Sequence, residues 1–206
     1  MNRQSLEEKE LKLKLRLAQL ERNEACQNNF LQFVRRLWPE FITGRHHEII
    51  AEKLERVAKG ELKRLIINMA PRHTKSEFAS FLFPAWMMGR KPNMKIIQAT
   101  HTTELAVNFG RKTKNMIDSD EYKEIFPEVK LAADSKASGR WDTSAGGMYY
   151  AVGVGSNLAG RGGDLVIIDD PHSEQTAMSN NGFDDAWEWY TGGPRQRLQP
   201  GGSIVL

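Results

Sequence analysis

Short apolar runs alternate with longer amphipathic segments through the middle of the chain, and this alternation constrains the fold more than any other feature. Residues 65–68 and 95–100 have the length and apolar content of strands. Residues 75–83 and 103–117 repeat apolar positions at helical spacing, and we expect the first of these helices to end near Pro84. Strands that alternate with helices form a parallel sheet with covering helices, so the predicted class is α/β.

The second half of the sequence adds further strands. Residues 140–143 and 148–154 flank a glycine-containing turn and predict a β-hairpin, and residues 165–168 form an apolar run typical of a buried strand. Residues 203–206 begin another strand at the end of the sequence. Because neither a turn nor a polar tail follows, we expect a fragment whose domain is incomplete at its C-terminus.

The first 60 residues are predicted to be helical. Residues 5–23 are rich in strong helix formers, and residues 30–59 fit two helices and a turn. Leucines recur along the first helix at Leu6, Leu11, Leu13, Leu15, Leu17 and Leu20. Their apolar surface needs a cover, which is either their own chain, the alternative we favour, or a partner. The predicted organisation is a helical segment over residues 1–60 and a core over residues 61–206.

The composition is that of one ordinary globular domain, with 206 residues of which 40% are hydrophobic and 27% charged. The net charge of +3 is compatible with a polyanionic partner but does not identify one. No stretch approaches the ~20 apolar residues that span a bilayer, and the N-terminus is charged, so we expect a soluble protein without a signal peptide. The single cysteine, Cys26, is expected to be an unreactive thiol.

A candidate phosphate loop lies between the first predicted strand and the next helix. Residues 69–76 read Met-Ala-Pro-Arg-His-Thr-Lys-Ser, of which only Lys-Ser matches the pattern G-x-x-x-x-G-K-[ST]. Met69 and Thr74 occupy the two glycine positions. Positive φ strains a β-branched residue, so we expect a loop that avoids positive φ at Thr74. The alternative is a surface turn with an incidental Lys-Ser pair.

A nucleotide-binding loop would give these residues distinct roles. Lys75 would bind the β- and γ-phosphates of ATP, and Ser76 would ligate Mg²⁺. Arg72 would place a planar cation near the γ-phosphate. Pro71, His73 and Thr74 would complete the loop around the phosphates.

Two carboxylates follow the apolar run at residues 165–168. Asp169 and Asp170 would lie at the carboxyl end of a buried strand, where open α/β sheets bind ligands. Adjacent residues of an extended strand point in opposite directions. We therefore expect Asp169 to hold Mg²⁺ and Asp170 to orient or deprotonate the attacking water. A polar turn that merely ends the strand is the alternative.

These segments together resemble the ATPase domain of the large terminase subunits of tailed phages, the motors that package DNA. The similarity covers residues 30–206, and its most specific part joins Pro-Arg-His-Thr-Lys-Ser-Glu to Ile-Ile-Asp-Asp-Pro. Further segments of similarity lie at residues 41–47, 99–101, 153–163 and 197–202. The family loop often reads Pro-Pro-Arg-His-Gly-Lys-Ser, from which this chain departs at Ala70 and Thr74, and Asp170 stands where the family usually has Glu.

The resemblance implies a RecA-like P-loop ATPase that uses ATP and Mg²⁺ to move double-stranded DNA into a prohead. In this family an arginine of the loop senses the nucleotide, and Arg72 corresponds to it. A second arginine, before the acidic strand, serves a neighbouring subunit, and Arg161 corresponds to it. The implied partners are the portal protein, the small terminase subunit and further copies in a ring, with no membrane, in the host cytoplasm. A coupling motif and a nuclease domain would follow Leu206.

Several other residues give weaker indications. His46 and His47 are adjacent and would project to different faces of a helix, so we expect structural roles rather than a shared metal site. His101 would lie near the γ-phosphate or belong to a helix-capping turn, and we favour the turn. The remaining aromatic residues are spaced for packing rather than for stacking on bases, and they are Trp141, Trp187, Trp189 and Tyr190.

The sequence leaves two other functions open. One is a helicase-like P-loop ATPase that remodels DNA. The other is a non-catalytic remnant that binds DNA or partners without hydrolysis, because Thr74 and Asp170 depart from the usual pattern.

Overall fold

The structure, a computed structural model, describes residues 3–135 and 137–206. The strands are β1 (Arg64–Leu65), β2 (Lys95–Thr100), β3 (Arg140–Asp142), β4 (Met148–Gly153), β5 (Gly163–Asp169) and β6 (Leu198–Val205). The helices are α1 (Arg3–Asn28), α2 (Phe30–Leu37), α3 (Arg45–Ala58), the π-helix η1 (Glu77–Leu82), α4 (Phe83–Arg90), α5 (Thr103–Asp118), α6 (Asp120–Ile125), α7 (Glu174–Ala177), α8 (Gly182–Gly192) and the 3₁₀-helix η2 (Pro194–Arg197).

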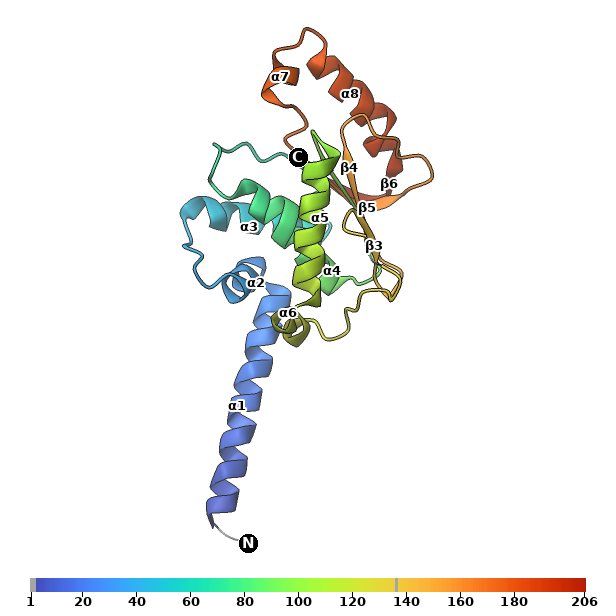
Figure 1. Cartoon of the computed structure of the whole chain (residues 1–206). Coiled ribbons are helices and arrows are strands. Elements are labelled where there is room, and N and C mark those ends of the chain that lie inside the picture. The colour runs from blue at the N-terminus through green and yellow to red at the C-terminus, as the bar shows by residue number, and fades with distance from the viewer. Residues whose placement is uncertain (1–2, 136) are drawn as a thin grey trace.

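The strands form one six-stranded sheet in the order β1-β6-β5-β2-β4-β3. Neighbouring strands are parallel, except that β3 is antiparallel to β4. Helices lie against the sheet, and α1 projects from the body of the molecule (Figure 1). The predicted α/β class with a mostly parallel sheet is confirmed.

Local sequence patterns located most of the central elements. The predicted strand at residues 95–100 is β2, and the predicted helix at residues 103–117 is α5. The predicted hairpin is the β3–β4 pair, in which Trp141 stacks on Tyr149 with ring centroids 4.9 Å apart. The apolar run before Asp169 forms β5, which is almost entirely buried between β2 and β6.

The expected end of a helix near Pro84 is wrong, because the helix continues through this residue. Residues 77–82 form the π-helix η1, and the N–H of Phe83 donates to the carbonyl of Phe78, five residues earlier. The change from π to α geometry at Phe83 makes Pro84 a first-turn residue of α4. Proline has no N–H to donate to the preceding π turn, and it occupies a first-turn position of α4.

The first predicted strand is shorter than expected. β1 pairs only with β6 and contains two residues. One further hydrogen bond follows it, from the N–H of Ile67 to the carbonyl of Leu206 at 2.7 Å. β1 is an edge strand and pairs with one neighbouring strand, β6. The chain then leaves the sheet toward residues 69–76.

One face of the sheet shares its core with the helices that precede β1. Phe30 of α2 is fully buried, and its ring centroid lies 5.4–5.7 Å from those of Phe78, Phe83 and Trp86. Aromatic rings at such distances stabilise a core beyond their buried area. Residues 30–58 are therefore packed into the same core as the sheet.

The opposite face of the sheet is covered by α8 and by the segment between β4 and β5. Ile97, Val166 and Ile168 of the sheet form a second apolar cluster with Leu158, against which Trp189 of α8 packs. Hydrophobic packing therefore fixes both faces of β5. Because both faces are held, the position of Asp169 at the end of β5 is fixed as well.

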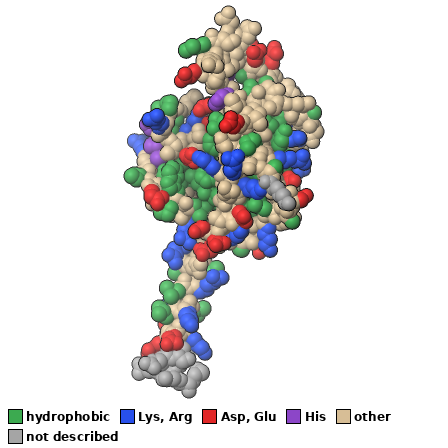
Figure 2. All heavy atoms as spheres, in the orientation of Figure 1, with side chains coloured by type: hydrophobic (Ala, Val, Ile, Leu, Met, Phe, Trp, Pro, Cys, Tyr) green, Lys and Arg blue, Asp and Glu red, His purple; other side chains and the backbone are tan. Residues whose placement is uncertain are grey.

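α1 does not bury its leucines on its own chain, so the expectation of self-packing is wrong for the leucines whose side chains the structure describes. Leu11, Leu13, Leu15, Leu17 and Leu20 are 49–71% exposed. The side chain of Leu6 lies outside the described part of the chain. Hydrophobic side chains are visible along the projecting helix (Figure 2).

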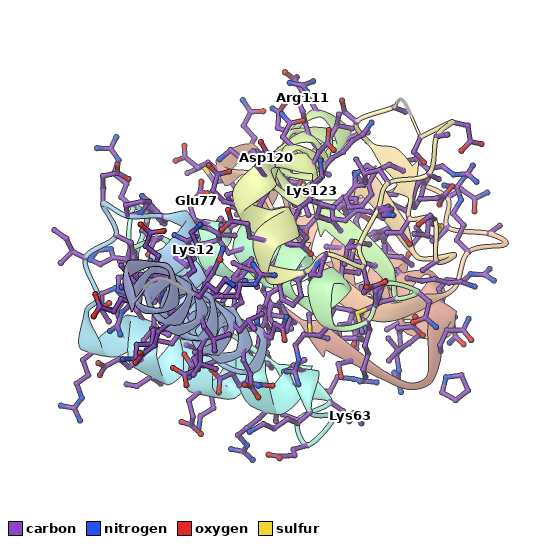
Figure 3. The ribbon with its side chains drawn as sticks, turned by 90° about the horizontal axis from the view of Figure 1, so that it is seen from below. Lys12, Lys63, Glu77, Arg111, Asp120 and Lys123 are labelled. Atoms are coloured by element: carbon purple, nitrogen blue, oxygen red, sulfur yellow. The ribbon has the colours of Figure 1, made fainter. Side chains whose placement is uncertain are left out.

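Among the residues that the structure describes, hydrogen bonds to the body come from the last turns of α1. The Asn23 side-chain amide donates to the Glu124 carbonyl at 2.7 Å, and the Gln27 amide donates to the Ile125 carbonyl at 2.5 Å. Seen from below, α1 lies beside α6, the helix that carries Asp120 and Lys123 (Figure 3). Cys26 is buried at this junction, and burial raises the pKa of its thiol, in keeping with the expected lack of reactivity.

Within the described part of the chain, no helix combines the length with the apolar content that a membrane-spanning helix requires.

Candidate functional site

Lys75 meets both predicted carboxylates at the carboxyl ends of the strands. Its ammonium Nζ lies 2.5 Å from Asp170 Oδ1 and 3.5 Å from Asp169 Oδ1. Lys75 follows β1 and the two acids end β5, and β6 lies between these strands. Two interstrand spacings separate β1 from β5 by roughly 10 Å, a gap that the residue 69–76 loop and Lys75 span.

The three charges differ in their access to solvent. The Asp169 side chain is 7% exposed and that of Lys75 is 20% exposed, whereas the Asp170 side chain is 64% exposed. Partial burial acts to lower the pKa of Lys75. The hydrogen bonds that Lys75 donates to Asp170 and Asp169, together with the negative charges of these residues, outweigh burial and raise the pKa above its usual value. Lys75 is therefore a fully charged partner for these carboxylates.

The two acids do not point in opposite directions, so that expectation is wrong. Both carboxylates contact the same Lys75 ammonium. Asp169 is the last residue of β5, and Asp170 has left extended backbone, with φ at 44°. The alternation of a strand applies only to extended residues, and the turn at Asp170 brings its carboxylate back toward Lys75.

Ser80 holds the buried carboxylate, and sequence reasoning missed it. Its hydroxyl donates to Asp169 Oδ2 at 2.9 Å, and both side chains are buried. Ser80 lies in η1, so the helix that follows the loop also orients the acid at the end of β5. The available signal was a lone hydroxyl within the otherwise apolar run Phe-Ala-Ser-Phe-Leu-Phe.

The loop adopts positive φ at two non-glycine residues, so the expectation for Thr74 is wrong. Thr74 has φ of 65° and Arg72 has φ of 63°. Such values strain a β-branched residue, and strained conformations persist only where the surroundings enforce them. Hydrogen bonds of the Thr74 side chain supply that enforcement.

His47 of α3 anchors Thr74. The Gly44 N–H donates to His47 Nδ1 at 2.9 Å, so the ring proton of neutral His47 is on Nε2. Nε2–H therefore donates to Thr74 Oγ1 at 2.6 Å, and Thr74 Oγ1–H donates to the His73 carbonyl, also at 2.6 Å. These two bonds hold the Thr74 side chain from both sides. They fix the backbone at Thr74, the position at which the usual phosphate loop has its second glycine.

The surroundings of His47 keep its ring neutral. The ring is buried between Phe41 and Phe78, whose ring centroids lie 4.6 Å and 5.0 Å away. Burial, together with the neighbouring charge of His46, lowers the pKa of His47. The predicted structural role of His47 is confirmed, but the expectation that His46 and His47 project to different faces is wrong, because their ring centroids lie 3.8 Å apart. The contact of His47 with Thr74 was not foreseen, because their 27-residue separation is bridged only in the folded chain.

This lowered pKa predicts a pH-dependent stability. The unfolded state binds a proton at His47 near its ordinary pKa of about 6.5, whereas the folded state binds it only at lower pH. The contribution of His47 is thus present above pH ~6.5 and is lost as the pH falls toward the folded-state pKa. Urea unfolding of the wild type and of His47→Gln should be measured across this pH range. As the pH falls, the free energy of unfolding should decrease more steeply for the wild type, and equal pH dependences of the two proteins would contradict the assignment.

The loop leaves backbone donors without partners. The N–H groups of Arg72 and Thr74 donate no hydrogen bond to any residue that the structure describes. Residues in left-handed backbone turn successive N–H groups to one side, which forms a concave binding site for anions. A cavity of about 440 Å³ lies over the loop, and Asp170 and residues 69–77 line it.

The structure does not bring Arg161 to the loop of its own chain. Its guanidinium lies 3.6 Å from the Tyr150 ring centroid, and it precedes β5, whereas Asp169 ends that strand. The length of β5 separates Arg161 from Asp169 by roughly 20 Å. His101 follows β2, and Thr102 caps α5 by accepting from the Leu105 N–H, so the favoured capping turn is confirmed.

The other residues of the predicted loop lie together. His73 Nδ1–H donates to the Pro71 carbonyl at 2.9 Å, and Ser76 immediately precedes η1. No group of three His, Cys, Asp or Glu side chains that would enclose a metal occurs among the described residues. Mg²⁺ commonly binds through one or two carboxylates together with phosphates and water, so Asp169 and Ser76 are the residues that would hold it.

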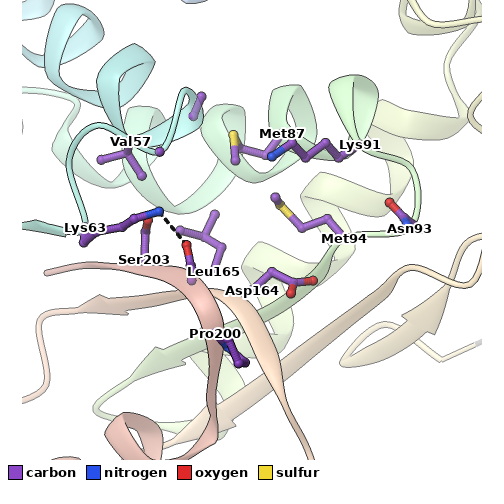
Figure 4. A pocket seen from close by; sticks show the side chains of 14 residues that line it. Val57, Lys63, Met87, Lys91, Asn93, Met94, Asp164, Leu165, Pro200 and Ser203 are labelled. Atoms are coloured by element: carbon purple, nitrogen blue, oxygen red, sulfur yellow. Dashed lines mark hydrogen bonds between the residues drawn. The ribbon is translucent and has the colours of Figure 1, made fainter.

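A second cavity, of about 290 Å³, lies at the other end of the strands, near the amino ends of β2 and β5 (Figure 4). Two of the charged side chains that line it are already paired. Lys63 donates to the Gly201 carbonyl at 2.6 Å, and Asp164 accepts from the Lys95 N–H at 2.8 Å. Ligands of open α/β sheets bind at the carboxyl ends of strands, so the loop side is the candidate site.

No protein-family model matches the chain, and neither does any curated protein. Its function must be inferred from the residues of the site.

Proposed function

We propose that the chain is the ATP-hydrolysing motor domain of a viral DNA-packaging terminase, with a RecA-like P-loop fold. It would couple ATP hydrolysis to the movement of double-stranded DNA into a prohead. The observation that carries the ATPase proposal is the convergence of Lys75, Asp169 and Asp170 beside the unpaired N–H groups of the loop. The sequence resemblance carries the choice of a terminase.

Each residue has a defined task in this proposal. Lys75 turns from the two carboxylates to the β- and γ-phosphates, while backbone N–H groups of residues 71–76 surround the phosphate chain. Asp169, which Ser80 orients, and the Ser76 hydroxyl would hold Mg²⁺. Arg72, exposed on the loop, contacts the γ-phosphate. When Lys75 moves to the phosphates, Asp170 is released to orient the attacking water.

Mg²⁺ would neutralise charge that develops on the phosphate oxygens during transfer. Arg161 serves a neighbouring subunit, which the length of β5 between Arg161 and its own Asp169 supports. This role requires a homo-oligomeric ring, and the portal protein and the small terminase subunit are its proposed partners in the host cytoplasm.

The test is phosphate release from ATP by the purified chain, with and without Mg²⁺ and blunt duplex DNA. We expect hydrolysis that requires Mg²⁺ and increases with duplex DNA. Stimulation by single strands alone would favour the helicase-like alternative. Absence of both ATP binding and hydrolysis, with DNA and partner subunits present, would contradict the proposal.

Binding without hydrolysis is a second candidate function. It is favoured by Asp170, whose side chain is one methylene shorter than Glu and is paired with Lys75. Calorimetric binding of ATP and Mg²⁺ without phosphate release under all of these conditions would support it.

Ser80→Ala is expected to weaken Mg²⁺-dependent ATP binding about 10-fold, because residues that orient a metal ligand typically contribute 10–100-fold to affinity. Titration calorimetry at several Mg²⁺ concentrations measures the effect. Ser203→Ala is the matched control, since Ser203 is also a buried serine but contacts the Leu62 carbonyl, away from the loop. Equal effects of both substitutions would refute a specific role for Ser80.

A further inference from the structure

The exposed leucines of α1 form two stripes on opposite sides of the helix. At about 100° per residue, Leu13, Leu17 and Leu20 fall within one narrow stripe, and Leu11 and Leu15 lie on the opposite side. All five side chains are at least 49% exposed. A helix in water gains stability by covering such a stripe, so each stripe is a candidate contact surface.

Only the first stripe continues into a groove. Leu20 at its end lines a cavity of about 590 Å³ between α1 and α6, together with Arg16, Asn23, Gln27 and Lys123. The opposite stripe leads instead to Ala18 and Arg22, and Arg22 Nε donates to the carbonyl of Ala18. The stripe of Leu13, Leu17 and Leu20 and the groove thus form one continuous surface, long enough to receive a second helix.

We propose that two copies of this chain associate through this surface, with their α1 helices antiparallel and residues 10–17 of each helix in the α1–α6 groove of the other. The two-fold axis would pass near residue 18. Leu17 of each copy then packs against Leu20 of the second copy. This interface is independent of the nucleotide site.

Charge determines the direction of pairing. In a parallel pair, Glu10 and Glu24, which lie on the same face as the leucines, would each meet their own counterpart at the seam. Lys14 contacts Glu10 of its own helix at 2.6 Å. In the antiparallel pair it also lies within one turn of Glu21 of the second copy, and the two-fold axis repeats this contact. Glu10 of the second copy then approaches Gln27 and Lys123 at the groove. Opposite charges beside an apolar seam select partner orientation in helix pairs.

The surface is small, so the dimer should be weak, with a dissociation constant on the order of micromolar. Sedimentation equilibrium of the full chain over a wide concentration range, without nucleotide, should show a monomer–dimer equilibrium. A wild type that stays monomeric throughout would overturn the proposal and leave the stripe for a partner of another kind.

Charge reversal tests the orientation. Lys14→Glu and Glu21→Lys should each weaken the dimer at least about 5-fold, because each places like charges together twice. Lys14→Glu combined with Glu21→Lys should restore it in part, because the loss of the Lys14–Glu10 contact within the helix remains. A double variant as weak as the single ones would refute the antiparallel arrangement.

Substitution of the leucines tests the face. Leu17→Lys combined with Leu20→Lys should abolish dimerisation, because these two leucines face each other across the two-fold axis, and Leu11→Lys combined with Leu15→Lys is the matched control that should leave it intact. Circular dichroism would verify that both variants keep the helix content of the wild type. Equal loss in both variants would overturn the assignment to the Leu13 stripe.

Discussion

Lys75→Ala is expected to reduce the turnover of ATP by at least about 100-fold, because it removes the ammonium that would stabilise charge on the transferred phosphoryl group. Lys75 is also the partner of a buried carboxylate, since Asp169 is 7% exposed and lies 3.5 Å from its Nζ. Alanine leaves that carboxylate with the Ser80 hydroxyl. The nucleotide-free protein should therefore also lose stability.

Lys75→Arg separates the two effects. Arginine keeps the positive charge beside Asp169 and Asp170, so the melting temperature should stay near that of the wild type, whereas its planar group cannot replace the compact ammonium at the phosphates. Lys53→Ala is the control for loss of a surface lysine, because Lys53 contacts Glu52 on the exposed side of α3. If Lys75→Ala hydrolyses ATP like the wild type, the proposed site is wrong.

His47→Ala is expected to lower the free energy of unfolding by about 2–4 kcal/mol, as buried substitutions that leave a cavity and remove a hydrogen bond do. It removes a ring packed between Phe41 and Phe78, and it removes the donor to Thr74 Oγ1. The loop should then relax from positive φ at Thr74. ATP binding should weaken along with stability.

A double-mutant cycle with Thr74→Gly isolates the contact between the two residues. Glycine adopts positive φ without strain and has no side chain for His47 to hold. The loss of stability and of ATP affinity caused by His47→Ala should therefore be smaller in the Thr74→Gly background, by about 1 kcal/mol in stability. Chemical denaturation and titration calorimetry measure the two quantities, and strict additivity would show that His47 does not act through Thr74.

The structure explains how the departure at Thr74 is accommodated. A glycine needs no support at positive φ, whereas Thr74 is held by the hydrogen bonds from His47 and to the His73 carbonyl. The same contacts link α3 to the loop. A change in the position of α3 would therefore act directly on the loop backbone.

Elements whose pattern lies within a few consecutive residues were predictable from sequence. The apolar content of residues 95–100 and 165–168 identified β2 and β5, since a short apolar run is typical of a buried strand. The position of Asp169 at the end of β5 followed from the same run. The juxtaposition of Lys75 with Asp169 followed in turn from the rule that parallel strands present their carboxyl ends at one edge.

What depends on residues distant in the chain was decided only by the tertiary structure. The backbone of Thr74 follows from His47, and the orientation of Asp169 follows from Ser80. The exposure of the α1 leucines follows from the attachment of that helix through its last turns alone. The sequence by itself determined the central strands β2 and β5, the helix α5 and the acidic residues that follow β5. Only folding decided which side chains support those groups, because contacts between distant residues leave no periodic pattern in a single sequence.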